Sequence, residues 1–266
     1  MDESPPLPAT SLAQAIGSKH EPLTLPKDCY TSFVLPKGKP TCGLVWMHGL
    51  GDDESGWADA LEESFDLKGL KALDASGTSG SCRFMLPRAP RRRVTCNGGA
   101  TMPSWFDFLK LPLSATDADN YGCSLEEAIA SCGRVHAAID MLVSEGIPAE
   151  RIMVGGFSQG GAMAMLSTLT YPQRLAGVIV FSGICFFGEH VAKLAASPQC
   201  HDLKVFWGHG SKDTILHPSL QDFGVDILKR AGIAAVAKKY EVDHGNTQQE
   251  MDDAAAFFAS AIAAKV

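Results

Sequence analysis

A glycine-rich stretch, GFSQG at 156–160, carries a lone hydroxyl at Ser158. The preceding residues 151–154 form an apolar run suited to a buried strand, and the following residues 159–170 suit a helix. A serine at such a sharp turn projects its hydroxyl at the carboxyl edge of a parallel sheet, where ligands bind in open α/β folds. The turn crowds the backbone, so small residues must flank it. The pattern predicts a nucleophilic serine; a surface serine in a glycine-rich helix start is the alternative.

A serine hydroxyl is a weak nucleophile and needs a general base, which must itself be held by an acid. In folds of this kind the base comes last in the chain, in a loop after a late strand. His244 directly follows the last predicted strand, residues 234–242, and we predict that it is the base. His209 and His217 also follow Ser158, but we interpret them as loop histidines with local partners.

Two aspartates could orient the predicted base. Asp213 follows the predicted strand at 203–210, at the same sheet edge as Ser158. Asp243 adjoins His244 in the chain, but a direct neighbour is expected to point away from the imidazole. We therefore favour Asp213 as the acid and keep Asp243 as the alternative.

An oxyanion formed during acyl transfer needs two hydrogen-bond donors. One is predicted to be the backbone N–H of Gln159, at the start of the helix after the nucleophile. The other should come from a loop after an early strand, and HGLGDD at 48–53 is such a loop. Its glycines free the backbone to aim an N–H group, and we predict that Leu50 is the donor. His48 is interpreted as a residue that holds the loop rather than as a catalytic one.

Short apolar runs alternate with helical patterns along the chain. Several strands are continuously apolar, which indicates a mostly parallel sheet with helices on both faces. A long segment after residue 87 has no such pattern and is predicted to be loop. We predict one domain over 29–266 and a flexible extension over 1–28, which carries five prolines. The strands are expected at 42–47, 83–87, 151–156, 175–183, 203–210 and 234–242, and the helices at 124–146, 159–170, 218–231 and from about 247. Ser124 and Glu127 are predicted to form a capping box at the start of the first helix. Asn246 and Gln249 could cap the last helix.

Composition narrows the function further. The 266 residues carry a formal net charge of −7, which argues against nucleic-acid binding. The eight cysteines are scattered without CxxC spacing, so we expect neither disulfides nor a structural zinc site, and no metal. Neither a signal peptide nor a transmembrane segment is evident, and we expect a cytoplasmic protein.

The segment 97–113 is unusually apolar for a loop. Its bulky residues include Met102, Trp105 and Leu109. Core packing would explain some of them, and an acyl-chain channel beside the active site would explain others. We predict that these three residues bind substrate, with Trp105 and Leu109 also contributing to structure.

Five motifs occur in the order and spacing of the acyl-protein thioesterases, a group of the phospholipase/carboxylesterase family. The resemblance extends over roughly residues 40 to 262 and rests on HGLGD (48–52), MPSWFD (102–107), GGFSQGGAMA (155–164), GHGSKD (208–213) and DHGNTQQEM (243–251). It implies an α/β-hydrolase fold without a large lid and hydrolysis without a cofactor. It also implies the same triad, Ser158, Asp213 and His244, with oxyanion donors at Leu50 and Gln159.

The function that the resemblance implies is removal of palmitate from S-acylated proteins. A general carboxylesterase or lysophospholipase acting on lipid or ester substrates is the alternative, and a non-catalytic binder of acylated peptides is a third hypothesis. Membrane contact is expected to be transient at most, and the protein to be a monomer or a weak homodimer.

The chain departs from the family pattern at several positions. Thr214 stands where the family commonly has proline after the acid, and Ile184 stands where many members carry an aromatic residue. Residues 2–4 lack the cysteine that some animal members carry and acylate. The run Arg91–Arg93 is interpreted as a solvated loop rather than a docking patch for acidic groups.

Overall fold

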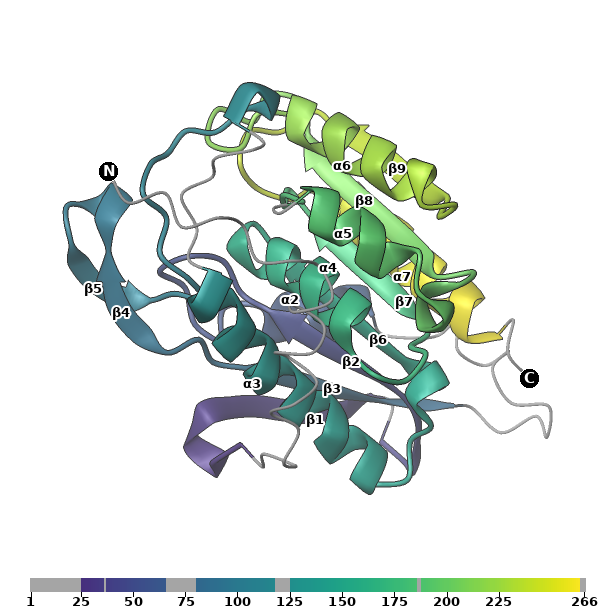
Figure 1. Ribbon diagram of the computed structural model, residues 1–266. Helices are drawn as coiled ribbons and strands as arrows, with labels where there is room; N and C mark the ends of the chain where they lie inside the picture. Colours follow the sequence, from purple (N-terminus) through teal and green to yellow (C-terminus); the bar gives the residue numbers. More distant parts are fainter. Residues whose placement is uncertain (1–24, 36, 66–79, 118–124, 186–187, 264–266) are drawn as a thin grey trace.

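The computed structural model describes residues 25–35, 37–65, 80–117, 125–185 and 188–263. A seven-stranded sheet runs through the molecule in the order β1-β3-β2-β6-β7-β8-β9 (Figure 1). Only the β1–β3 pair is antiparallel, and every other neighbouring pair is parallel. The strands are β1 (Tyr30–Leu35), β2 (Pro40–Met47), β3 (Ser81–Pro87), β6 (Ile152–Phe157), β7 (Gly177–Phe181), β8 (Lys204–Gly210) and β9 (Ala235–Tyr240).

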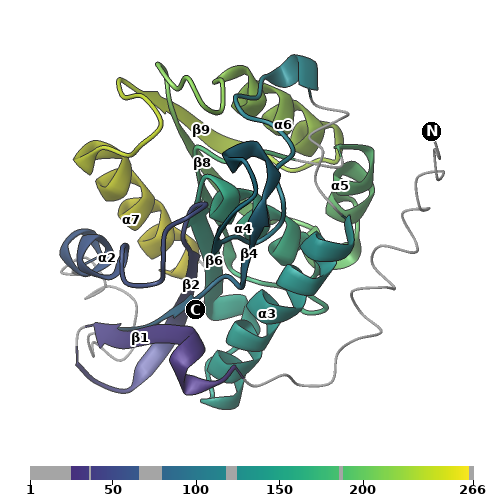
Figure 2. The same ribbon diagram turned by 90° about the vertical axis from the view of Figure 1, so that its left-hand side faces the viewer.

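Helices cover both faces of this sheet, as predicted. One face packs against α3 (Leu125–Ser144), α4 (Gln159–Thr170), α5 (Gly188–Ala195) and α6 (Ser219–Arg230). The other face packs against α2 (Ala58–Ser64) and α7 (Gln248–Ala263). Figure 2 views the sheet between these two layers. The central strands β6 and β7 are buried on both sides, which is why their sequences are continuously apolar.

A second, two-stranded sheet lies where the sequence predicted a loop. Strands β4 (Arg91–Val94) and β5 (Ala100–Pro103) pair antiparallel and project from one end of the molecule (Figure 1). The hairpin reverses through Gly98 and Gly99, both at positive φ. Three arginines in one strand gave no apolar alternation, so the sequence pattern did not show this hairpin.

Other boundaries also differ from the expectations. Leu25 lies within the predicted extension but is buried against the core. The hydroxyl of Thr247 accepts from the N–H of Glu250, so Thr247, not Asn246, caps α7. Ser124 of the predicted capping box lies outside the described residues; the carboxylate of Glu127 pairs with Arg92. The described cysteines are free, as expected; Cys123 lies outside the described residues.

In the part of the chain that the structure describes, no helix has the length and apolarity needed to cross a membrane.

Candidate active site

Ser158 occupies a strained turn between β6 and α4. Its backbone has φ 55° and ψ −118°, in a region that residues with a side chain seldom adopt. The N–H of Ser158 donates to the carbonyl of Phe181 in the neighbouring strand, over 2.8 Å. Backbone strain of this kind is found preferentially at functional sites. The turn presents the hydroxyl at the carboxyl end of β6.

The two glycines that flank this turn have no room for a side chain. A Cβ atom at Gly156 would lie 2.5 Å from the carbonyl carbon of Gly160. At Gly160 it would lie 2.3 Å from the carbonyl oxygen of Met47 and 2.5 Å from that of His48. The predicted crowding is therefore confirmed, and its partners include the end of β2, which the local sequence did not show. We call residues 156–160 the elbow.

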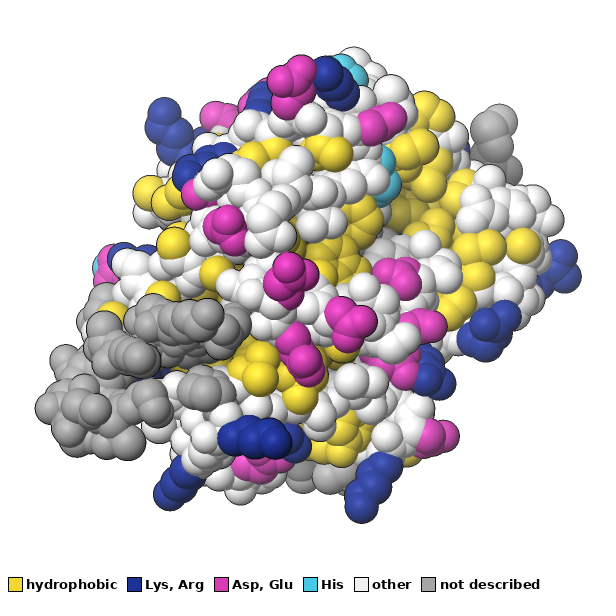
Figure 3. Space-filling model, turned by 180° about the vertical axis from the view of Figure 1, so that it is seen from behind, with side chains coloured by type: hydrophobic (Ala, Val, Ile, Leu, Met, Phe, Trp, Pro, Cys, Tyr) yellow, Lys and Arg dark blue, Asp and Glu magenta, His cyan; other side chains and the backbone are white. Residues whose placement is uncertain are grey.

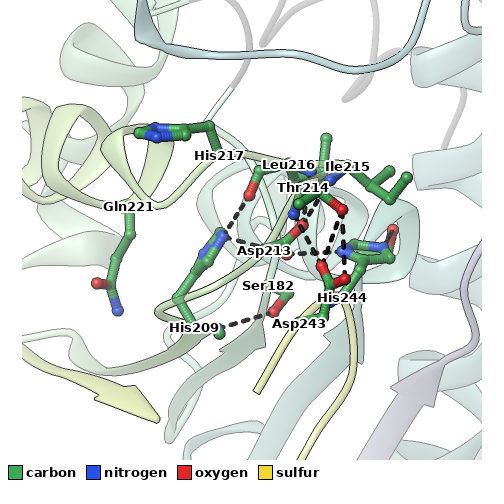
Figure 4. Close-up of polar contacts among 12 residues, drawn as sticks. Ser182, His209, Asp213, Thr214, Ile215, Leu216, His217, Gln221, Asp243 and His244 are labelled. Carbon is green, nitrogen blue, oxygen red and sulfur yellow. Dashed lines mark hydrogen bonds and ion pairs between the residues drawn. The ribbon is translucent and has the colours of Figure 1, made fainter. Parts of the chain in front are cut away.

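The loops after β8 and β9 bring two further side chains to Ser158. We call residues 211–218 the acid loop and 241–247 the base loop. Nε2 of His244 lies 2.9 Å from Oγ of Ser158, and its Nδ1 lies 2.7 Å from Oδ2 of Asp213. These contacts form one continuous chain, and Figure 4 shows its Asp213–His244 part. All three residues follow parallel strands, whose carboxyl ends meet at one edge of the sheet.

The surroundings of Asp213 keep its carboxylate ionised. Burial by itself would raise the pKa, but hydrogen bonding to His209 and His244 and the backbone N–H of Leu216 lowers it well below its ordinary value. An ionised carboxylate only accepts hydrogen bonds. Nδ1 of His244 must then carry the ring proton, and Nε2 is left with a lone pair facing the hydroxyl of Ser158.

The alternative acid and the two other histidines lie elsewhere. The carboxylate of Asp243 is exposed and bonds to Thr214 and to the backbone N–H of His244, not to the imidazole. His217 is exposed and bonds to Ser219. His209 is fully buried and bonds to the carbonyl of Leu216, although its Nε2 is also 3.5 Å from Oδ2 of Asp213. Both histidines therefore have local partners, and His209 also braces Asp213.

His48 fixes the loop that is predicted to supply an oxyanion donor. Its Nδ1 lies 2.7 Å from the carbonyl oxygen of Gly49, and its Nε2 accepts from the N–H of Ala89 over 3.1 Å. These partners require a neutral ring with the proton on Nδ1, and burial lowers the pKa of His48 accordingly. Carbonyl and N–H point in opposite directions across a trans peptide. Holding the Gly49 carbonyl therefore turns the N–H of Leu50 away from the His48 ring.

Trp105 lies in the interior rather than against the pocket, where it was predicted to contact substrate. Its side chain is fully buried, and its indole N–H donates to the carbonyl of His48 over 2.9 Å. The backbone N–H of Trp105 donates to the side chain of Gln159 over 2.8 Å. The Gln159 amide also donates to the carbonyl of Phe106. Trp105 thus joins the elbow to the loop that carries Leu50.

A pocket of about 280 Å³ opens beside Ser158. Figure 3 shows the hollow, with hydrophobic side chains around it. None of the three residues predicted to bind substrate lines the pocket: Trp105 is buried, and Leu109 is 54 % exposed on the surface. Met102 instead accepts from the side chain of Asn97. Leu50, the predicted oxyanion donor, is part of the lining. The apolar lining comes mainly from Phe108, Leu111, Phe157, Ile215 and Leu216.

Sequence reasoning missed Ile215 and Leu216 as pocket residues. They belong to the acid loop, and a parallel bridge joins Leu216 to Leu113. Their contact with the segment around Leu111 spans about a hundred residues, so no local pattern indicated it. The nearest signal was the apolar pair directly after Asp213.

The chain is similar in sequence to a known protein family and to several of its members. The family model for phospholipase/carboxylesterase matches residues 30–262. A probable carboxylesterase of Oryza sativa subsp. japonica is 37 % identical over 210 residues, which are 78 % of this chain and 73 % of the relative. Acyl-protein thioesterase 1 of Mycosarcoma maydis is 36 % identical over 237 residues, covering 85 % of this chain and 94 % of the relative.

Comparison with solved structures indicates the same family. The crystal structure of Arabidopsis thaliana SOBER1 superposes with a TM-score of 0.71 at 27 % identity, covering 83 % of this chain and 98 % of that chain. The family match extends over nearly all of the described residues, including the elbow and both loops. The chain therefore belongs to the phospholipase/carboxylesterase family, and it is a serine hydrolase with the α/β-hydrolase fold that acts on esters or thioesters.

Proposed function

We propose that the protein cleaves acyl thioesters through Ser158, Asp213 and His244, and that S-acylated, palmitoylated proteins are its substrate class. The observation that carries the catalytic part is the continuous contact from Oγ of Ser158 through His244 to the carboxylate of Asp213. Such a chain lets the base accept the serine proton while the carboxylate stabilises the imidazolium that forms.

The reaction then follows in two steps. Oγ of Ser158 attacks the acyl carbon, its proton passes to Nε2 of His244, and the carbonyl becomes an oxyanion held by the N–H groups of Leu50 and Gln159. Collapse breaks the carbon–sulfur bond, and His244 returns the proton to the leaving thiolate. Water, activated by the same nitrogen, attacks the acyl-enzyme and releases the carboxylic acid and free Ser158.

Two observations support an acyl substrate. The pocket beside Ser158 is lined mainly by apolar side chains, including Leu111 and Ile215. Relatives at 33 to 36 % identity carry the name acyl-protein thioesterase 1. An apolar wall favours the hydrocarbon part of a substrate over a charged one.

A general carboxylesterase acting on shorter acyl groups is the second candidate. The cavity volume of about 280 Å³ lies just below the usual range of roughly 300 to 1,000 Å³ for small-molecule sites. The rice relative is moreover named as a probable carboxylesterase. Acyl-chain length is therefore the property that separates the two candidates.

The test measures kcat/KM against acyl length on monomeric thioester and oxyester substrates, below micelle formation. Each buried methylene contributes about 0.8 kcal/mol, part of which is lost to ordering of the chain, so we expect roughly 10- to 100-fold between eight and sixteen carbons. Leu111→Ala should flatten this rise. Leu109→Ala is the matched control, because Leu109 is exposed and lies outside the pocket lining.

A profile that peaks at two to four carbons and does not respond to Leu111→Ala would establish the carboxylesterase instead. Labelling of Ser158 by a fluorophosphonate distinguishes both enzymes from a protein that binds acylated peptides without cleaving them.

A further inference from the structure

The carboxylate of Asp243 joins the acid loop to the base loop. Its Oδ1 accepts from the backbone N–H of Thr214 over 2.8 Å and lies 3.0 Å from the Thr214 hydroxyl oxygen. The same oxygen accepts from the backbone N–H of His244 over 2.9 Å. One exposed side chain thus gathers donors from both loops, and Figure 4 shows it between Thr214 and His244.

The two loops therefore exchange a crossed pair of contacts. Asp213 reaches forward to the ring of His244, and Asp243 reaches back to Thr214. Asp213 is followed directly by Thr214, and Asp243 by His244, so the two contacts lie side by side. A shift of either loop would change both contacts together.

Backbone hydrogen bonds alone do not hold the loops this far from the sheet. Ser211 donates to the carbonyl of Tyr240 and Lys212 to that of Val242, which extends the pairing of β8 and β9 by two steps. Within the described residues, the backbone pairing of these two loops ends there. From Asp213 onward the hydrogen bonds between them run through side chains.

We infer that Asp243 is a positioning residue, which with Thr214 fixes the separation of the acid and base loops and so the Asp213–His244 contact. This inference rests on the triad role proposed above for those two residues. Asp243 itself contacts neither the imidazole nor Ser158 and takes no part in proton transfer.

Fixing the separation of the loops matters because catalysis tolerates little displacement of the reacting groups. A misplacement of about 1 Å in a catalytic group can cost roughly 100-fold in rate. The imidazole of His244 is partly exposed, so packing alone restrains it less than it restrains Ser158. Hydrogen bonds from the Thr214 backbone and hydroxyl and from the His244 backbone lower the pKa of Asp243, which keeps its carboxylate an acceptor at neutral pH.

The Asp243–Thr214 pair also gives a role to a departure from the family pattern. Proline, the residue common in acyl-protein thioesterases after the acid, has neither a backbone N–H nor a hydroxyl. It could donate nothing to Asp243. This chain can form the contact between Asp243 and Thr214, which we call the clamp, because it has threonine at position 214.

The experiment compares Asp243→Ala with Asp243→Asn, whose amide oxygen can still accept both backbone N–H groups. The substrate is a short soluble ester, and kcat is expressed per Ser158 that reacts with a fluorophosphonate, which removes any effect of unfolded protein. We expect Asp243→Ala to lower kcat about 10-fold with KM changed less than twofold, since positioning acts on the transition state. Asp243→Asn should recover to within about threefold of wild type.

Two further variants complete the test. Thr214→Val should lower kcat about threefold in the wild-type background and have no further effect in Asp243→Ala, because the two side chains act through one contact. Glu241→Ala is the matched control: it removes an exposed ion pair with Lys212 that joins the same two loops, and kcat should stay within twofold.

Wild-type kcat per reactive serine in Asp243→Ala would overturn the inference. So would a loss in Asp243→Asn as large as in Asp243→Ala, because the charge rather than the clamp would then be responsible. Ser158→Ala with the same ester, its activity expressed per folded protein because it has no Ser158 to label, separates this outcome from failure of the proposed function. An active Ser158→Ala protein would refute the triad, whereas an inactive one beside a fully active Asp243→Ala protein would refute the clamp alone.

Discussion

The elbow and the two loops that face it are held by different forces. Backbone packing fixes Ser158, since Gly156, Gly160 and the end of β2 are in direct contact. The acid and base loops depend instead on side-chain hydrogen bonds, at Asp213 and at the exposed carboxylate of Asp243. Backbone also packs closely at the start of the base loop, where a Cβ atom at Gly210 would lie 2.3 Å from the carbonyl oxygen of Asp243. Beyond that point the hydrogen bonds between the two loops run through side chains, whereas the nucleophile is held by backbone throughout. Mutations of the elbow glycines should act on folding, and mutations of the polar side chains that join the loops should act on kcat.

The largest effect on activity is expected when a catalytic side chain is removed from either region while the fold is left intact. Ser158→Ala and His244→Ala should each lower kcat by about 10⁶, because residues that act as a unit fail together. Both proteins should keep the wild-type unfolding temperature. His217→Ala is the control, since His217 is exposed and bonds to Ser219. More than about one per cent of wild-type activity in either purified variant would contradict the assignment.

The second prediction concerns stability of the elbow. A methyl group at Gly160 would lie 2.3 Å from the Met47 carbonyl oxygen, and backbone cannot move aside cheaply. Gly160→Ala should therefore lower the free energy of unfolding by about 3 kcal/mol or more. Gly133→Ala is the matched control, because a methyl group there meets nothing within 4 Å on α3 and should stabilise by up to about 1 kcal/mol. Denaturant titration measures both. Equal stabilities would show that packing does not fix the elbow.

The third prediction concerns the helix that follows the base loop. Glu250 is fully buried on α7 against Gly208, and neither carboxylate oxygen has a hydrogen-bond partner among the described residues. Burial raises its pKa from an ordinary 4.5 to about 8. The folded protein therefore holds a proton that the unfolded chain releases between these two pH values. The stability contributed by protonated Glu250 is complete below about pH 4.5 and is lost as the pH rises through 8.

Such a difference in pKa corresponds to at most about 5 kcal/mol, of which we expect about half after relaxation of the surroundings. Wild type should lose this stability between pH 5 and pH 8, and Glu250→Gln should not. The measurement is the free energy of unfolding of both proteins across that range. Parallel curves would show that Glu250 is ionised in the folded protein.

The smallest effect is expected at His209, behind the acid. Its Nε2 contacts both the carbonyl of Leu216 and Oδ2 of Asp213, so it steadies Asp213 without touching Ser158 or His244. His209→Leu should lower kcat about 10-fold with little change in KM, and His209→Gln, which keeps a donor at similar reach, should recover most of it. A loss expressed in KM rather than kcat would indicate that His209 shapes the pocket instead.

Fold class and much of the site could be predicted from the sequence, because local patterns carried them. The apolar runs of β6, β7 and β8 indicated a parallel sheet, and the elbow is compact enough to recognise in five residues. Strand β1 and helices α2 and α5 were missed, in addition to the hairpin of β4 and β5. Strand β1 is a half-buried edge strand, and α2 is only seven residues long with a single buried residue, so neither shows a clear apolar period.

The role of Trp105 shows where such reasoning stops. An apolar residue in a loop beside a predicted active site suits either a pocket wall or the core, and both interpretations fit the sequence equally well. The indole bonds to the carbonyl of His48, fifty-seven positions away in the chain, and this contact exists only in the folded protein. Orientation of a side chain depends on distant neighbours, which local sequence does not contain.

The sequence by itself determined the order of the parallel strands and of the longer helices, and it singled out the residues of the proposed triad, because periodicity, glycine spacing and chain order are local properties. The tertiary structure decided what holds those residues together. It placed Asp243 on Thr214, Trp105 against the carbonyl of His48, and the acid-loop residues Ile215 and Leu216 on the pocket wall. Each of these contacts joins segments that meet only when the parallel strands bring their carboxyl ends to one edge, so their distances follow from the assembled sheet.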